Sequence, residues 1–183
     1  DFKDDNVFKN IIMTTDILLG DCFSLMKQKE NESIDLIFTS PPYWNQRDYG
    51  VEEQWGAERT VQEYLEKMKN WAEECRRILK NTGCLFLNIG DKYSKKGLLM
   101  IPERISLSMI ENGWCLRNTI IWNKPNHMPS SVKDRFCNTY EYDYFFVKDS
   151  QKYYNYSYYQ NIDCLRKQPD TPPTNDKWPL TLS

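Results

Sequence analysis

The sequence predicts an α/β fold of three layers, in which a mostly parallel sheet carries an antiparallel hairpin at residues 116–147. Short apolar runs alternate with a long amphipathic helix, as in sheets with helical crossovers. Several runs end in Gly-Asp or Pro-Pro, which puts polar groups at the carboxyl edge of the sheet. With 183 residues, 40% of them hydrophobic, the chain is large enough to bury one core.

The first elements lead to a pair of prolines. Residues 17–19 are expected to form a short buried strand, and residues 22–29 a helix behind it. A second strand covers residues 34–39 and must stop at Pro41, because proline cannot donate to a strand ladder. The residues around Pro41 are therefore presented at the end of a strand.

The clearest helix begins at the capping box that Thr60 and Glu63 form, and its apolar residues keep helical spacing up to Gly83. A strand over residues 84–89 follows. The remaining expected elements are a helix from Pro102 to Gly113, strands over 116–122 and 140–147, an edge strand over 153–159, and a linker or frayed tail over 166–183.

The charge is unevenly distributed along the chain. The formal net charge of −2 argues against a protein that coats nucleic acid by charge alone. Residues 92–135, however, hold 8 basic and 3 acidic side chains, a local excess of +5. If any stretch meets a phosphate backbone, it is this one. The candidate phosphate contacts are Lys95, Lys96, Lys124, Lys133 and Arg135, each of which is nearly as compatible with an ordinary solvated surface.

Neither a metal site nor a membrane segment is indicated. The six cysteines include no C-x-x-C pair, and His127 is the only histidine, so no zinc-ligand spacing can be written. The chain shows no leader and no apolar run long enough to cross a bilayer. We therefore expect an intracellular protein, cytoplasmic or associated with the nucleoid, with reduced thiols.

Thr39-Ser40-Pro41-Pro42-Tyr43 is the candidate catalytic segment. The prolines stiffen the turn, so that the Ser40 hydroxyl and the Pro41 carbonyl converge on one point beside an aromatic ring. Such a pocket suits a planar group bearing an amine. Accepting the N–H bonds of a base amine would localise its lone pair and aim it at an electrophilic methyl group. Tyr43 would stack on the base after it flips out of the duplex.

Four pieces of the sequence stand in a characteristic order: Leu19-Gly20-Asp21-Cys22 before the strand 34–38, Thr39 to Tyr43 with Trp44 and Arg47-Asp48-Tyr49-Gly50, Leu87-Asn88-Ile89-Gly90-Asp91, and Ile120 to Asn126. With these pieces the chain resembles the amino-group DNA methyltransferases in which the catalytic segment precedes the glycine-rich cofactor segment. The resemblance implies a Rossmann-like methyltransferase fold over residues 11–165, S-adenosyl-L-methionine as cofactor, duplex DNA as partner, and direct transfer without a metal.

The resemblance also implies roles for single residues. The Gly-Asp turn of the family contacts the cofactor's adenine, which implies that role for Asp21 and Cys22; Thr39 and Ser40 complete the expected cofactor set. For Asp21 the alternative is a helix-capping carboxylate. Trp44 and Arg47 are expected on the side of the target base.

A serine before the prolines favours cytosine-N4 methylation, with adenine-N6 as the competitor. Cytosine-C5 methylation is disfavoured because the chain lacks a Pro-Cys dipeptide, and zinc deamination because it lacks H-x-E with P-C-x-x-C. The family's Phe-x-Gly-x-Gly segment is also missing. A C-terminal segment or a second chain therefore has to supply it, or the chain is a non-catalytic DNA-binding or regulatory subunit. The same Pro-Pro-Tyr pocket would also accept an amine on RNA or on a protein glutamine, so methylation of these acceptors stays open as an alternative.

Overall fold

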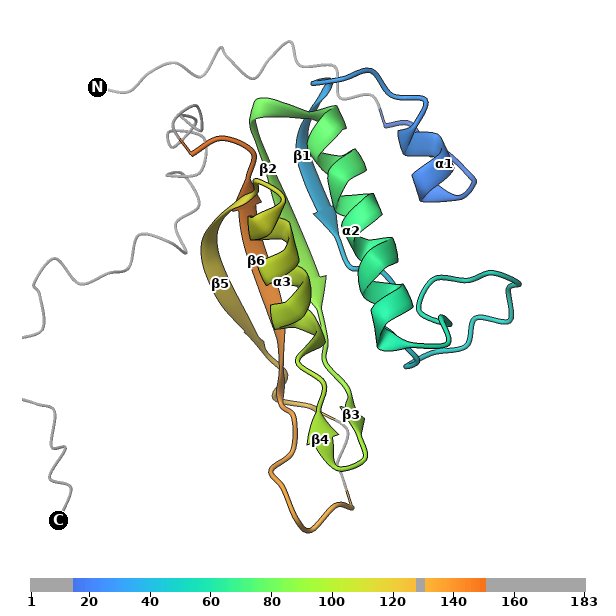
Figure 1. The fold of residues 1–183 in the computed structure, drawn as a ribbon, viewed down its shortest axis with the longest axis vertical. Coiled ribbons are helices and arrows are strands. Elements are labelled where there is room, and N and C mark those ends of the chain that lie inside the picture. The colour runs from blue at the N-terminus through green and yellow to red at the C-terminus, as the bar shows by residue number, and fades with distance from the viewer. Residues whose placement is uncertain (1–14, 128–130, 151–183) are drawn as a thin grey trace, which may run out of the picture.

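The computed structural model describes residues 15–127 and 131–150, and these form one mixed sheet with helices packed on it (Figure 1). The sheet has the strand order β1-β2-β6-β5, and β3 and β4 form a separate small hairpin. The strands are β1 (Ile34–Thr39), β2 (Leu79–Ile89), β3 (Tyr93–Ser94), β4 (Gly97–Leu98), β5 (Cys115–Asn123) and β6 (Tyr140–Val147), and the helices are α1 (Cys22–Met26), α2 (Val61–Ile78) and α3 (Ile101–Glu111).

The prediction of a strand at residues 17–19 is wrong. These residues are coil, and the side chains of Ile17 and Leu19 are 91% and 100% exposed. In the described part of the chain β1 pairs only with β2, so residues 17–19 leave the outer edge of β1 unpaired. The helix that follows is shorter than expected, and its N-cap is Asp21.

The α2 helix begins where the capping box places it but ends earlier than predicted. Thr60 Oγ1 accepts a hydrogen bond from the Glu63 N–H at 3.1 Å. The helix stops at Ile78 rather than at Gly83, because Leu79 adopts an extended backbone and pairs with Ile34 of β1. Pairing with β1 thus begins before the predicted strand 84–89, and β2 starts at Leu79.

The second half of the sheet follows the sequence pattern closely. The predicted strands 116–122 and 140–147 are β5 and β6, which pair antiparallel as a hairpin. Helix α3 has a proline in its first turn and is followed by Gly113, as expected. Its N-terminus is capped from a distance, because Asp91 accepts backbone N–H bonds from Met100 at 2.9 Å and Ile101 at 3.1 Å.

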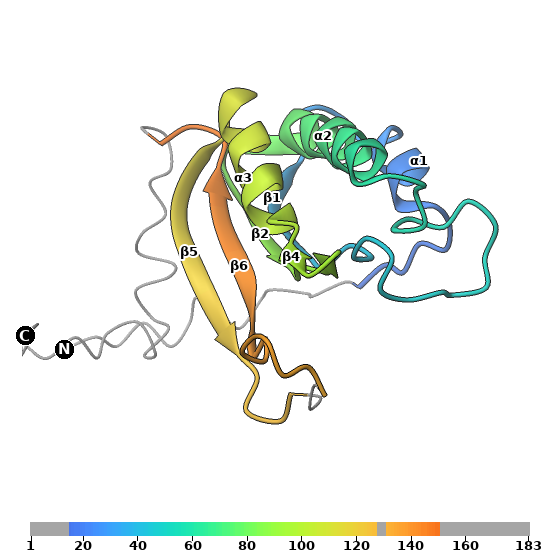
Figure 2. The same cartoon turned by 60° about the horizontal axis from the view of Figure 1, so that its bottom comes forward.

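The α/β class is confirmed, but parallel pairing is limited to β1 and β2 in the described residues; β2–β6 and β5–β6 are antiparallel. Helices α2 and α3 lie on the same face of the sheet (Figure 2). Two layers of the expected three are therefore present in the described part. The opposite face carries a row of rings, in which Phe86 stacks on Phe145 at 4.7 Å and Phe38 adjoins Phe86 at 6.0 Å.

The core lies between that sheet and the two longer helices. Leu85, Leu87 and Phe146 are fully buried on the sheet, against Tyr64 and Met68 of α2. No helix among the described residues is long and apolar enough to span a membrane. The predicted edge strand 153–159 and the tail 166–183 lie outside the described residues.

Candidate active site

The candidate catalytic segment lies at the carboxyl end of β1. Thr39 is the last strand residue and pairs with Leu87 of the parallel neighbour β2, so the ends of both strands open at the same edge of the sheet. A cavity of about 330 Å³ lies there. It is lined by Ser40, Pro41, Pro42, Tyr43, Gln46, Arg47, Tyr49, Asn88, Lys124 and Glu141.

Four side chains form a compact hydrogen-bond network in this cavity, those of Ser40, Tyr43, Asn88 and Glu141. Ser40 Oγ lies 3.1 Å from both the Tyr43 hydroxyl and Asn88 Oδ1. The Tyr43 hydroxyl lies 2.5 Å from Asn88 Oδ1 and 3.1 Å from Glu141 Oε2. Since Tyr43 has a single proton, it donates to one of these two acceptors at a time. The network fixes the Ser40 hydroxyl and the Tyr43 ring relative to the end of β2.

Gly90 packs closely against one side of the Tyr43 ring. A Cβ atom added to Gly90 would lie 2.8 Å from Tyr43 Cε2, so only glycine at that position allows this approach. Burial raises the pKa of Tyr43 well above its usual value, although the hydrogen bond with Ser40 acts in the opposite direction. The hydroxyl is therefore protonated at neutral pH and can act as a donor.

Asn88 and Glu141 were not predicted as site residues. The Leu87-Asn88-Ile89 strand pattern pointed to the sheet edge but did not single out Asn88, and Glu141 is 98 residues from its partner Tyr43. Lys124, which was expected to contact phosphate, lines this cavity and forms an ion pair with Glu141. Arg47, which was expected near the target base, lines the same cavity.

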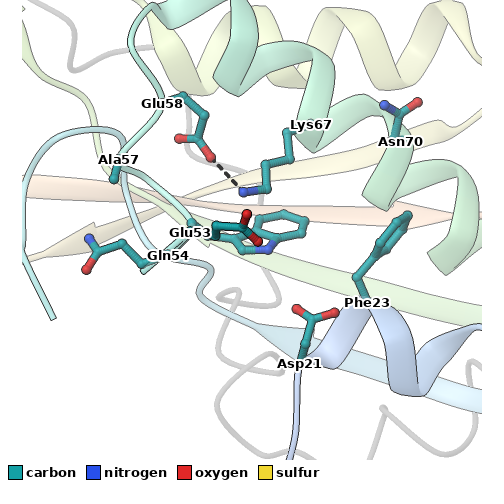
Figure 3. A pocket seen from close by; sticks show the side chains of 9 residues that line it. Asp21, Phe23, Glu53, Gln54, Ala57, Glu58, Lys67 and Asn70 are labelled. Carbon is teal, nitrogen blue, oxygen red and sulfur yellow. Dashed lines mark ion pairs between the residues drawn. The ribbon is translucent and has the colours of Figure 1, made fainter. Parts of the chain in front are cut away.

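A second cavity, of about 600 Å³, lies beside α1 and α2 (Figure 3). Asp21 borders it and also caps α1 by accepting a hydrogen bond from the Ser24 N–H at 2.8 Å. That bond lowers the pKa of Asp21, so the carboxylate is charged at neutral pH. The cavity is lined by Asp21, Phe23, Glu53, Gln54, Trp55, Ala57, Glu58, Lys67 and Asn70. It therefore combines aromatic surfaces with several carboxylates.

Three other predicted residues lie outside both cavity linings. Cys22 is the first residue of α1, and Thr39 is held in the strand pairing with β2. Trp44 packs against the core, and its indole N–H donates to the Glu58 carbonyl at 3.0 Å. Lys92 lies over the Trp44 ring at 5.6 Å. The structure thus gives Trp44 a structural contact beside the cavity.

The remaining basic residues meet beyond the carboxyl end of β2, where the β3–β4 hairpin lies next to the loop before β6 (Figure 1). Lys95 and Lys96 occupy the turn of the hairpin with φ of 48° and 69°. Lys96 forms an ion pair with Asp134 at 3.4 Å, and Arg135 lies over the ring of Tyr93 at 3.6 Å. We call the β3–β4 hairpin and this adjoining loop the protrusion. These contacts place Lys133, which is exposed, close to it.

The chain matches known DNA methylases over most of its length. A family model described as DNA methylase matches residues 34–182. Type II methyltransferase M.MwoI of Methanothermobacter wolfeii is 51% identical over 142 residues, covering 75% of this chain and 21% of that protein. Type II methyltransferase M.Cfr9I of Citrobacter freundii is 34% identical over 181 residues, covering 83% of this chain and 58% of that protein. The chain thus spans less than two thirds of either relative.

Solved structures share the fold. PvuII DNA methyltransferase (cytosine-N4-specific) matches with a TM-score of 0.59 and 26% identity, over 71% of this chain and 48% of that one. TTHA0409 from Thermus thermophilus, complexed with S-adenosyl-L-methionine, matches with a TM-score of 0.54 and 22% identity, over 72% of this chain and 52% of that one. The sheet is therefore part of the Rossmann-like methyltransferase fold. Because the family model covers most of its residues, the chain belongs to the N6/N4 DNA methylase family.

Proposed function

We propose that this chain carries the target-base site of an S-adenosyl-L-methionine-dependent methyltransferase that acts on the N4 amine of cytosine in duplex DNA. The observation that carries the proposal is the hydrogen-bond network that joins Ser40, Tyr43 and Asn88 at the end of β1. Family membership supports the reaction class. A serine before the prolines, and the likeness to the cytosine-N4-specific PvuII enzyme, support cytosine as the base.

The network suits the amine chemistry for a specific reason. When Ser40 donates its proton to Asn88 Oδ1, the lone pairs of Ser40 Oγ remain available to accept an N–H of the base amine. The Pro41 carbonyl accepts the second N–H, and together they localise the nitrogen lone pair. Tyr43, held against Gly90, presents its ring to the flipped base. S-adenosyl-L-methionine, when bound, supplies the electrophilic methyl group.

The cavity beside α1 suits the adenosine part of this cofactor. Phe23 and Trp55 pack edge to face at 6.3 Å and provide apolar surface for a purine ring. Asp21 and Glu53 supply acceptors for an exocyclic amine and for ribose hydroxyls. In this proposal Asp21 both caps α1 and contacts the ligand, so the two expected roles are compatible.

DNA approaches from the carboxyl edge of the sheet. Lys95, Lys96 and Lys133 contact phosphates, since they are exposed on the protrusion next to the target-base cavity. Arg47 lines the cavity itself and meets the target nucleotide or its neighbours. Lys124 neutralises Glu141 rather than a phosphate, because the two already form an ion pair.

Further polypeptide completes the cofactor site, either as a C-terminal segment of a longer gene product or as a second chain, and it carries the glycine-rich segment. The match to the PvuII enzyme covers 48% of that structure. Among the described residues no strand pairs with the outer edge of β1, which offers a place for another strand, and on β1 the side chains of Leu36 and Phe38 are 46% and 69% exposed. This surface is the one we assign to the completing polypeptide.

The test is transfer of radiolabelled methyl from S-adenosyl-L-methionine to mixed duplex DNA, followed by nucleoside mass spectrometry. We expect N4-methylcytosine from the full-length gene product. Ser40→Ala and Tyr43→Ala should each lower the rate at least about tenfold, as lost transition-state contacts do. Ser33→Ala is the matched control, because Ser33 precedes the opposite end of β1 and its hydroxyl bonds only locally to Glu30.

Other outcomes identify the alternatives. Detection of N6-methyladenine would show that the target base is adenine. Label in RNA or in a glutamine peptide, but not in DNA, would show that DNA is not the acceptor. Full activity in both site variants would refute the assigned site. No label and no cofactor binding, even with every partner chain present, would identify the chain as a non-catalytic DNA-binding or regulatory subunit.

A further inference from the structure

The turn that contains Gln54, Trp55, Ala57 and Glu58 forms one wall of the Asp21 cavity. Its backbone also packs directly on the catalytic segment. The Asn45 N–H donates to the Gly56 carbonyl at 2.5 Å. Gly56 has a φ of +86°, and a Cβ atom there would lie 2.7 Å from the Tyr43 carbonyl oxygen. The wall of one cavity is therefore in backbone contact with the wall of the other.

Glu58 contacts Lys67 in the Asp21 cavity and Trp44 next to the catalytic segment. Its side chain is only 9% exposed, and Oε1 forms an ion pair with Lys67 at 3.0 Å. Its carbonyl accepts the Trp44 indole N–H at 3.0 Å. Oε2 is buried and has no hydrogen-bond partner within the described residues. A buried carboxylate with an unused acceptor is unfavourable, so a new donor near this wall would be stabilising.

Lys67 contacts both the buried Glu58 carboxylate and the Trp55 ring that lines the cavity. Its ammonium group lies 4.8 Å from the centre of the Trp55 ring, and its side chain is 34% exposed (Figure 3). A ligand on the Trp55 ring would therefore meet Lys67 and displace water from it. Removing that water strengthens the attraction between Lys67 and Glu58. Lys67 thus joins the Glu58 carboxylate to the Trp55 ring in the cavity lining.

We propose that Glu58 is a positioning residue that couples occupancy of the Asp21 cavity to the placement of Trp44 and the adjoining Pro42-Tyr43 segment. This inference rests on the proposed function and goes beyond it, because it concerns how the cofactor pocket controls the target-base pocket. Tyr64 reinforces the link, since its buried hydroxyl donates to the Pro42 carbonyl at 3.0 Å. Glu58 holds one side of the catalytic segment and Tyr64 the other.

The experiment uses the full-length gene product labelled with 5-fluorotryptophan and observed by ¹⁹F NMR. Loss of one signal in Trp44→Phe assigns the Trp44 resonance. We expect saturating S-adenosylhomocysteine to shift this resonance in the wild type. In Glu58→Gln the shift should fall to less than half, and kcat should fall at least fivefold, by a larger factor than the Kd for S-adenosylhomocysteine rises. A purely structural role would not separate kcat from binding in this way.

Two further variants guard against a trivial loss of folding. Lys67→Gln breaks the same ion pair from its exposed end and should reproduce the reduced shift. Glu74→Gln is the matched control, because it breaks the Glu74–Arg77 ion pair on the same helix outside both cavity linings. Glu74→Gln should leave the Trp44 shift and kcat unchanged.

The failure of this inference is distinguishable from the failure of the proposed function. If the wild type binds S-adenosylhomocysteine and methylates DNA but Glu58→Gln keeps the full Trp44 shift and kcat, the coupling alone is refuted. The same holds if the Trp44 resonance does not respond in the wild type. If the wild type neither binds the analogue nor transfers methyl, the proposed function falls together with the coupling.

Discussion

Gly90→Ala adds one methyl group against the ring of Tyr43, and this change tests whether the ring position matters for methyl transfer. The added Cβ would lie 2.8 Å from Tyr43 Cε2 and 3.0 Å from Cδ2, whereas ordinary contacts begin near 3.4 Å. Gly90 needs no positive φ, so the substitution adds no backbone strain. The ring must therefore move by about half an ångström or more, and the 2.5 Å bond to Asn88 cannot survive unchanged.

Overpacking of this size costs about 1–3 kcal/mol of unfolding free energy. Each kcal/mol lowers Tm by about 2–4 °C for a domain of this length. The effect on catalysis should be larger, because a displacement of about 1 Å can cost about 100-fold in rate. We expect kcat to fall at least about tenfold, measured by radiolabelled methyl transfer at saturating DNA, with a modest fall in Tm measured by calorimetry.

The control and the double variant make the result specific. Gly97→Ala is the control for stability, because its new Cβ makes only an ordinary 3.6 Å contact with the Ser94 carbonyl. In a Tyr43→Ala background the clash is absent, so adding Gly90→Ala should cause little further loss. The argument that the ring position is critical is refuted if Gly90→Ala keeps the wild-type kcat. It is also refuted if the losses of kcat caused by Gly90→Ala and Tyr43→Ala are additive in the double variant.

Three other outcomes follow from the structure. Asp91→Ala removes the carboxylate that caps α3 and should lower the unfolding free energy by about 0.5–2 kcal/mol in urea titrations. Lys95→Gln with Lys96→Gln should reduce the slope of log K against log salt for DNA binding by about 1.8, whereas Lys29→Gln should not change it. Burial raises the pKa of Tyr64, so the folded state keeps the hydroxyl proton to a higher pH than the unfolded chain does. The contribution of this group to the unfolding free energy is therefore complete below about pH 10 and falls above it by about 1.4 kcal/mol per pH unit. Tyr64→Phe should remove that part of the alkaline loss in urea titrations from about pH 9 to about pH 12, and an unchanged slope would contradict it.

The sequence alone determined those features that depend on neighbouring residues. Strand β6 has the bounds that the apolar pattern predicts, and the Thr60 capping box marks the start of α2. Pro41 ends β1 because a proline lacks the N–H that pairing requires. The position of Ser40 at the sheet edge therefore follows from local chemistry, as does the candidate catalytic segment around it.

Sheet pairing decided what the local pattern left open. The apolar helical spacing of α2 continues to Leu79, yet pairing of Leu79 with Ile34 of β1 places residues 79–83 in a strand. Residues 17–19 have a strand-like composition, but no strand in the described part of the chain pairs with them. In both cases the backbone pairing that the fold makes, and not the intrinsic preference of the segment, decides the structure.

Only the tertiary structure identified the partners within the site. Asn88 and Glu141 reach Tyr43 from 45 and 98 residues away, and Lys124, a candidate phosphate contact, forms an ion pair with Glu141. The contact between Glu58 and Trp44 likewise joins a cavity wall to the catalytic segment. Sequence spacing indicates which residues share a strand or a helix face, but the register of β2 against β1 and β6 decides which side chains meet across them.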